Sequence, residues 1–342
     1  MKLKVFFVLL IVTSLLSASV VFAWDEPKAD YEWPENPTET YSLITATTVA
    51  GTSQCGDALL AINEQLKEES NGAVELDIFW EGTLGSSVEV GEACTTGTID
   101  IGLVTAAVAS NYVSAIDVMA LPFIIRGTDH LKAIIDECFD GVTAGIEDTL
   151  GTPLGLWGFG YHHLFTRDKE VKKMEDMKGL TVRVMEGKIF ADTFEALGAI
   201  PTNVALSELV TALQQGVVDG ADIATVTFVN QQQYTFCNYM YAFGYNYSAG
   251  LPILTKEAEE RYPEEVINLV KKVFYDNRYH AFEVGDRFDA EFMSVIEENG
   301  VAITVPDEED FAKLREAVQP VWDKYAERIG AELIEQVSNA GL

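Results

Sequence analysis

From Tyr41 onward, short runs rich in β-branched and aromatic residues alternate with stretches in which apolar residues recur at helical spacing. We expect a strand where apolar residues repeat about every 2 residues, and a helix where they repeat about every 3.6. Strands that alternate with helices along the chain are typical of α/β folds with mostly parallel strands. The expected strands cover residues 41–47, 75–79, 99–104, 153–159 and 180–184.

Helical spacing is clearest in three stretches, over residues 59–66, 190–197 and 207–215, each followed closely by a glycine that suits a helix end. The last third of the chain differs, because helical spacing is nearly continuous over residues 255–300 and returns over residues 311–322. A long helical tail after two α/β blocks predicts helices that bridge or brace two lobes.

The first 23 residues have the pattern of a secretion signal. Lys2 and Lys4 precede an apolar run over residues 5–16, and small residues up to Ala23 suit a cleavage site. The run is shorter than the roughly 20 residues of a membrane span, and no second long apolar run follows. No cysteine directly follows the run, so we expect no lipid anchor. The sequence predicts a periplasmic protein that begins with an extended lead-in over residues 24–40.

The charge balance argues against one large class of partners. The 342 residues carry 54 acidic and 23 basic side chains, a formal net charge of −31. Such a charge repels phosphate backbones and anionic lipid surfaces, so we expect no nucleic-acid partner. A solvated acidic surface is the simpler explanation of the charge.

Signatures of metal sites, cofactors and catalysis are missing. Cys55, Cys94, Cys138 and Cys237 allow three disulfide pairings, and the sequence leaves open whether they pair or stay as buried thiols. No C-x-x-C, H-E-x-x-H, G-x-S-x-G or phosphate-loop G-K-S/T motif occurs. We therefore expect no cofactor, no metal site and no enzymatic activity, although metal assistance in ligand binding stays open.

Arg183 is the most informative single residue. On the strand expected over residues 180–184, Leu180, Val182 and Val184 share one face, whereas Arg183 lies on the other. A cation among apolar strand residues needs an anionic partner. Either one of the many carboxylates forms a structural ion pair with it, or its guanidinium binds the carboxylate of a ligand bidentately.

Several motifs, in order and behind a signal peptide, resemble the substrate-binding proteins of tripartite ATP-independent periplasmic (TRAP) transporters of the dicarboxylate-binding type. The most specific are "MEDMKGLTVRV" at residues 174–184 and "LGAIPTNVALSELVTALQQGVVDG" at residues 197–220. Supporting pieces are "GTLGSSVE" at residues 82–89, "TGTIDIGLV" at residues 96–104 and "LPFIIRG" at residues 121–127. The resemblance covers nearly the whole chain after the signal peptide.

The resemblance implies a fold and a function. Such proteins have two α/β lobes with a ligand cleft between them and a long bridging helix. One lobe would comprise residues 41–153 and 244–288, and the other residues 154–243 and 289–342. The protein would capture an organic acid in the cleft and deliver it to the integral membrane subunits of the transporter, with no covalent chemistry.

The same resemblance implies ligand-binding residues, beginning with Arg183 as the partner of the ligand carboxylate. A second arginine is common twenty residues earlier in the family, where this chain has His163 instead. Asp222 stands where a glutamate is common, and either accepts a hydrogen bond from the ligand or is a solvated or capping carboxylate. Thr48 and Thr105 follow strands whose ends face the usual ligand crevice of α/β sheets.

Aromatic residues are a further candidate for the cleft. Trp157, Phe159 and Tyr161 alternate along the chain, and on a regular strand they share one face. We expect Trp157 to lie in the core and include Phe159 and Tyr161 among the candidate ligand contacts.

Two rival functions remain open. One is a subunit of a sensory system or another class of periplasmic binding protein, which the same architecture serves. A less favoured alternative is an exported enzyme that positions a carboxylic acid with Arg183 and uses His163 as a general base.

The identity of the acid is also open. The absence of a second arginine argues against a dicarboxylate held by an arginine at each end. A monocarboxylate, a keto or hydroxy acid, or an aromatic acid fits equally well.

Overall fold

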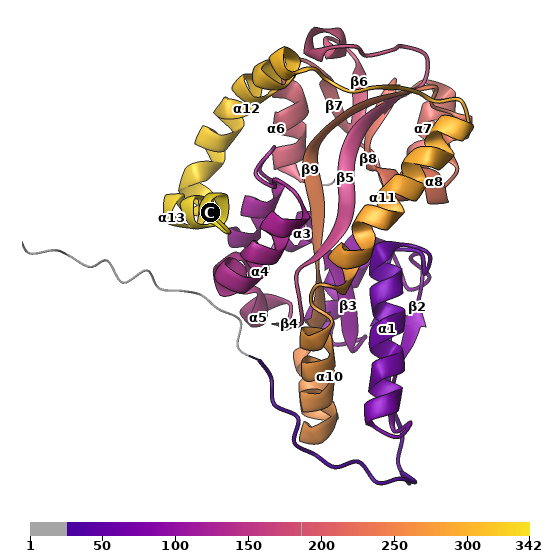
Figure 1. Ribbon diagram of the computed structural model, residues 1–342, viewed down its shortest axis with the longest axis vertical. Coiled ribbons are helices and arrows are strands. Elements are labelled where there is room, and N and C mark those ends of the chain that lie inside the picture. Colours follow the sequence, from indigo (N-terminus) through magenta and orange to yellow (C-terminus); the bar gives the residue numbers. More distant parts are fainter. Residues whose placement is uncertain (1–25, 186) are drawn as a thin grey trace, which may run out of the picture.

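The computed structural model describes residues 26–185 and 187–342 (Figure 1). The expected signal peptide lies outside the described residues. The lead-in has neither helix nor strand from residue 26 to residue 40, as expected. It is nevertheless tied to the body, because the Asn71 side chain donates hydrogen bonds to the carbonyls of Trp33 and Pro34, and Trp33 packs against buried apolar residues.

One mixed sheet of ten strands forms the centre of the molecule. Along its main path the strand order is β2-β1-β3-β9-β5-β8-β6-β7, with β4 and β10 added beside β9. The strands are β1 (Tyr41–Ala46), β2 (Val74–Phe79), β3 (Ile101–Thr105), β4 (Thr152–Pro153), β5 (Trp157–Thr166), β6 (Thr181–Val184), β7 (Ile200–Asn203), β8 (Gly220–Ala224), β9 (Tyr239–Leu254) and β10 (Ala302–Thr304).

Along the main path of the sheet, parallel pairing is confined to the two ends, and the short β10 also pairs in parallel with β9. Strands β1, β2 and β3 pair in parallel at one end, and β6, β7 and β8 do so at the other. Between them, β9 and β5 run antiparallel to each other and to their outer neighbours β3 and β8. The expectation of mostly parallel strands therefore holds for each end and is wrong for the middle, where two long strands join the ends (Figure 1).

Strand β9 is the main element that the sequence did not predict. It is 16 residues long, and ten consecutive residues from Tyr245 to Leu254 are buried. A strand buried on both faces shows no alternation of apolar and polar residues, which removes the pattern used to find strands. Gly244, Gly250 and Pro252 interrupt the sequence further.

Helices cover both faces of the sheet, and most of the expected ones are present. The α-helices are α1 (Gln54–Glu69), α2 (Ser87–Thr96), α3 (Ala106–Ala109), α4 (Thr128–Val142), α5 (Ile146–Thr149), α6 (Lys188–Ala196), α7 (Leu209–Gln215), α8 (Thr225–Asn230), α9 (Lys256–Arg261), α10 (Glu264–Asp276), α11 (His280–Glu298), α12 (Glu308–Ile329) and α13 (Ala331–Asn339). Short 3₁₀ helices are η1 (Ala115–Ala120), η2 (Met174–Met177), η3 (Leu206–Glu208) and η4 (Gln233–Thr235).

Helix α11 is the bridging helix that the resemblance implied. It contacts α1 at one end of the sheet, α8 at the other, and β5 between them. The C-terminal helices also span the molecule, because α12 packs on α6 whereas α13 packs on α4. Arg126 and His130 hold the α13 region through the backbone carbonyls of Val337, Ser338 and Ala340.

The four cysteines are buried free thiols, which resolves the alternative left open by the sequence. Burial raises the pKa of the Cys94 thiol to about 12 and that of the Cys138 thiol to about 11. Both are therefore protonated and weakly nucleophilic near neutral pH.

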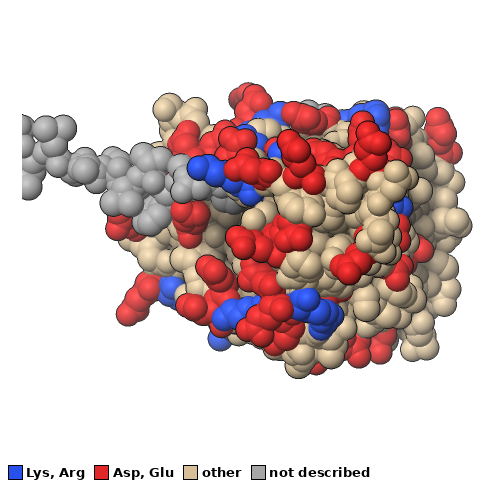
Figure 2. Space-filling view, turned by 90° about the horizontal axis from the view of Figure 1, so that it is seen from below, with Lys and Arg blue, Asp and Glu red and all other residues tan. Residues whose placement is uncertain are grey.

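The charged residues lie mostly on the surface of the protein. Figure 2 shows a face over which Asp and Glu spread while Lys and Arg form a few small groups.

Candidate functional site

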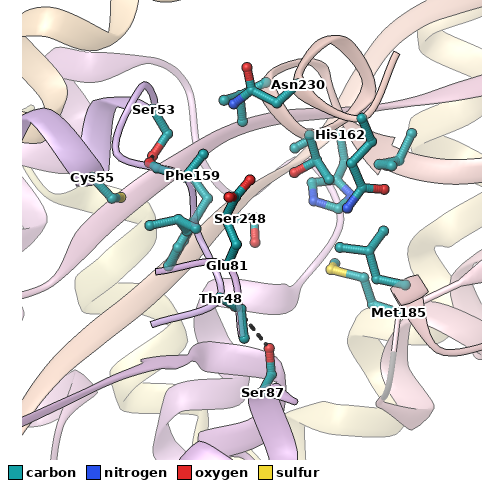
Figure 3. Close-up of a pocket in the computed structure, with 18 of the residues that line it drawn as sticks. Thr48, Ser53, Cys55, Glu81, Ser87, Phe159, His162, Met185, Asn230 and Ser248 are labelled. Atoms are coloured by element: carbon teal, nitrogen blue, oxygen red, sulfur yellow. Dashed lines mark hydrogen bonds between the residues drawn. The ribbon is translucent and has the colours of Figure 1, made fainter. Parts of the chain in front are cut away.

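A cavity of about 190 Å³ lies between the strands at one end of the sheet, β1 to β3, and those at the other end, β6 to β8. One side of its lining comes from the segment between β1 and α1 and from the loop after β2. The other side comes from β6, β8 and α8, and the long strands β5 and β9 each contribute as well. Figure 3 shows Thr48, Ser53 and Glu81 across the opening from His162 and Met185. Any ligand held here contacts both ends of the sheet at once.

Arg183 lines this cavity and is only 3% exposed. Its strand neighbours Val182 and Val184 are fully buried on the opposite face, as the alternation predicted. The guanidinium is fixed by two hydrogen bonds, from Nε to the Val204 carbonyl at 3.0 Å and from one terminal nitrogen to the Asp222 carbonyl at 2.9 Å. These carbonyls orient the cation toward the cavity, a geometry suited to bidentate binding of a carboxylate.

Asp222 lies beneath the cavity wall and does not line the cavity. Its fully buried carboxylate accepts hydrogen bonds from His162 Nδ1 at 2.7 Å and from the Tyr245 hydroxyl at 2.8 Å. Burial and the adjacent carboxylate raise the pKa of Tyr245 well above its ordinary value, so the hydroxyl stays a donor. Asp222 therefore acts on the cavity through His162 and through its own carbonyl, which holds Arg183.

His162, and not the expected His163, is the histidine that lines the cavity (Figure 3). Because His162 Nδ1 donates to Asp222, its Nε2 is left as an acceptor in the neutral ring and a donor in the protonated ring. His163 points elsewhere, and its Nδ1 accepts a hydrogen bond from the Gly244 N–H at 3.0 Å. Burial, with His162 adding to it, lowers the pKa of His163 to about 3, so this ring is neutral at pH 7.

A β-bulge explains why the aromatic side chains of β5 do not all lie on the same face of the strand. The register of β5 against β9 shifts between Gly158 and Gly160, which reverses the alternation of side chains after that point. Phe159 lines the cavity. Tyr161 lies instead in a separate shallow pocket beside Arg126. The expectation that the three aromatic residues share one face is therefore wrong. Trp157 is fully buried and stacks on Phe274, as expected of a core residue.

Of the two threonine candidates, one lines the cavity and the other does not. Thr48 lines the cavity, and its hydroxyl lies 3.2 Å from that of Ser87. Thr105 lies outside it and caps α3, accepting a hydrogen bond from the Val108 N–H. Of the seven residues predicted from the sequence, the structure brings Arg183, Thr48 and Phe159 to the cavity, whereas His163, Asp222, Thr105 and Tyr161 lie outside its lining.

The cavity includes polar residues that the sequence reasoning missed, notably Gln54, Glu81 and Ser248. Gln54 is the first residue of α1, directly after the cap Ser53. A signal for it was present, because a helix N-terminus that follows a strand of an α/β sheet commonly faces the ligand crevice. Glu81 carries no comparable pattern, since it lies in an irregular loop.

The described part of the chain offers little for other kinds of site. It contains no group of three or more His, Cys, Asp or Glu side chains placed to hold a metal ion. No helix in it has the length and apolar character needed to cross a membrane.

Comparisons with known proteins agree with this geometry. Residues 45–328 match the model of the bacterial extracellular solute-binding proteins, family 7. A solute-binding protein of Verminephrobacter eiseniae is 25% identical over 296 residues, which cover 85% of this chain and 87% of that one.

Two solved structures share the fold. The sugar acid binding protein of Advenella mimigardefordensis, in complex with galactonate, has a TM-score of 0.83 at 21% identity, covering 88% of this chain and 98% of that one. A TRAP periplasmic solute binding protein of Sulfurospirillum deleyianum, with bound succinate, has a TM-score of 0.81 at 23% identity, covering 89% of this chain and 100% of that one.

Proposed function

The chain belongs to family 7 of the bacterial extracellular solute-binding proteins, and on this premise we propose that its solute is an organic acid whose carboxylate binds Arg183. The family serves transport: its members bind a solute outside the cytoplasm and work with the membrane subunits of TRAP transporters. The similar structures from Advenella mimigardefordensis and Sulfurospirillum deleyianum hold galactonate and succinate, which are both carboxylates.

The placement of Arg183 carries the proposal. Arg183 is 3% exposed, is held by two backbone carbonyls and lines the cavity, so its guanidinium is a fixed cation beside the space that a ligand can occupy. His162 is close by on the same cavity wall, and its ring supplies a further polar contact for a carboxylate oxygen. A carboxylate is the ligand group that matches the planar fork of an arginine.

The sheet topology supports closure of two lobes around the acid. Among the described elements, β5, β9, α11 and the C-terminal helices link the two ends of the sheet. Residues 250–254 of β9 pair with β3 at one end, whereas residues 239–241 pair with β5 and β10 toward the other. The proposed lobe boundaries near residues 154, 244 and 289 fall in or beside these linking elements. A ligand that contacts both lobes favours the closed state by its additional contacts there.

Export and delivery complete the proposal. A signal peptide over residues 1–23 brings the protein to the periplasm, where the acid is captured and passed to the membrane subunits of the transporter. The protein releases the acid unchanged. His163, the base of the alternative enzymatic mechanism, lies outside the cavity and contacts Gly244.

A thermal-shift screen against organic acids tests the function, with wild type, R183A and R315A. Arg315 is exposed on α12 and is a matched control for the loss of one positive charge. A ligand at about a hundredfold excess over its dissociation constant stabilises the wild type by about 3 kcal/mol. We expect acids that stabilise wild type and R315A but leave R183A unchanged.

Persistence of those shifts in R183A would show that the arginine is structural. The absence of any acid that stabilises the wild type would contradict the proposed function itself.

A further inference from the structure

Gln54 presents the least satisfied polar group of the cavity. Its side chain is fully buried, and within the described chain neither its amide oxygen nor its amide nitrogen has a hydrogen-bond partner. The residue lines the same cavity as Arg183. Burying an amide without partners is unfavourable, so this arrangement points to a group that binds there from outside the chain.

The position of Gln54 adds further donors. It is the first residue of the 16-residue helix α1, and Ser53 caps the Gly56 N–H. The first helical hydrogen bond runs from the Asp57 N–H to Ser53. The N–H groups of Gln54 and Cys55 therefore precede the helical ladder, at the positive end of the helix dipole.

The Gln54 amide lies where four elements meet. A Cβ atom placed on Gly160 of β5 would be 3.5 Å from Gln54 Nε2, 3.6 Å from Asp289 Oδ1 of α11 and 4.0 Å from a methyl group of Val226 of α8. A group bound by this amide is therefore in reach of elements from both ends of the sheet.

Glu81 brings a negative charge to the same side of the cavity. It is the only Asp or Glu among the described lining residues, just as Arg183 is the only Lys or Arg. Its backbone has a φ of +52°, unusual for a residue with a side chain, and its N–H donates to the Val49 carbonyl. Figure 3 shows its carboxylate extending into the opening.

The cavity is therefore polarised. We call Arg183, His162, Asp222 and Tyr245 the Arg183 end, and Gln54, Glu81 and the first N–H groups of α1 the Gln54 end. A hydroxyl group suits the Gln54 end, because it donates to the Glu81 carboxylate while it accepts from the Gln54 amide. A second carboxylate would instead face the charge of Glu81 with no lysine or arginine of the described lining to offset it.

We propose that the ligand is a hydroxylated monocarboxylic acid, with its carboxylate at Arg183 and its hydroxyl groups at Gln54 and Glu81, and that the cavity discriminates against dicarboxylates. This inference rests on the proposed function and narrows it to a substrate class.

Isothermal titration calorimetry with acids of matched chain length tests this inference. One pair is galactonate and galactarate, which differ only by the second carboxylate, and the other is erythronate and tartrate. We expect the monocarboxylate that binds to do so at least about tenfold more tightly than its dicarboxylate partner, the discrimination typical of one mismatched polar contact.

The E81Q variant sharpens this test, because it removes the charge and keeps the shape. We expect it to narrow the preference by improving the relative affinity of the dicarboxylate. Equal or tighter binding of the dicarboxylates to wild type, abolished in R183A, would overturn the inference and leave the proposed function standing. If no acid of either pair or of the wider screen binds, both fail.

The Q54L variant tests the role of the amide. We expect the affinity for the hydroxylated acid to fall about tenfold, while that for an unhydroxylated acid of the same length, such as hexanoate against galactonate, changes less than about twofold. Circular dichroism confirms that the variant folds. An equal loss for both acids, or no loss for either, would contradict recognition of hydroxyl groups by Gln54.

Discussion

The Arg183 end and the Gln54 end line one cavity but satisfy their polar groups differently. At the Arg183 end, protein groups bind the functional side chains: two carbonyls hold Arg183, and His162 and Tyr245 hold Asp222. At the Gln54 end, the buried amide has no partner in the described chain, and Glu81 is exposed. The first end is organised before the ligand arrives, whereas the second is completed by it.

This difference separates two tasks. A preorganised cation binds any small carboxylate that fits, so the Arg183 end contributes mainly to affinity. Groups that depend on the ligand for their hydrogen bonds reject a ligand that lacks the matching atoms, so the Gln54 end contributes mainly to selectivity. The ends also differ in their expected effect on folding, because satisfied buried groups stabilise the free protein and unsatisfied ones destabilise it.

The largest expected effect on folding is at the Arg183 end. Replacing Asp222 by alanine leaves the buried His162 and Tyr245 without their shared acceptor, and we expect a loss of about 3 kcal/mol in the free energy of unfolding. Guanidinium denaturation of wild type, D222A and the exposed control E316Q measures it. A loss below about 1 kcal/mol would show that this end is not held by the buried carboxylate.

The effect of intermediate size is a loss of folding stability at acid pH. The folded pKa of His163 is about 3, below the 6.5 of an unperturbed histidine, so the unfolded chain takes up more protons as the pH falls below 6.5. Wild type therefore loses stability from pH 6.5 downward, by about 1 kcal/mol near pH 5 when the partial exposure of the ring is allowed for.

The H163N variant isolates this contribution, because the asparagine oxygen can still accept from the Gly244 N–H and carries no titrating group. Denaturation at pH 7.5 and at pH 5 should show a smaller loss for H163N than for wild type. An identical loss in both proteins would mean that His163 takes no part in the acid response.

The smallest effect has the opposite sign. Replacing Gln54 by leucine removes an unpartnered buried amide, so we expect the free protein to gain about 0.5 kcal/mol in the free energy of unfolding even as hydroxy-acid binding weakens. The denaturation midpoint without ligand measures this. A loss of more than about 1 kcal/mol would place Gln54 among the structural residues and remove the contrast between the ends.

The sequence predicts the Arg183 end better than the Gln54 end. Arg183 was found because strand alternation separates it from Val182 and Val184, and the resemblance added its role. His163 was preferred to His162 through family spacing, and only the contacts of each ring show which one faces the cavity. Strand position alone could not decide, since β5 has irregular register at both Gly158 and His162.

Other features depend on contacts between distant segments. Strand β9 lacks alternation because both its faces are buried, so its role as a link between the ends is not visible in the sequence. Gln54 is one of many polar residues at helix starts, and its unpartnered amide follows from how α1, β5, α8 and α11 meet. Such features follow from tertiary packing, which the local pattern does not encode.

The most direct test of the account is a crystal structure of the protein with the tightest-binding acid from the calorimetric pairs. We predict a carboxylate within about 2.9 Å of the Arg183 guanidinium and a hydroxyl group hydrogen-bonded to the Gln54 amide, so that one molecule joins the two ends. A carboxylate bound at the start of α1 and away from Arg183 would contradict it.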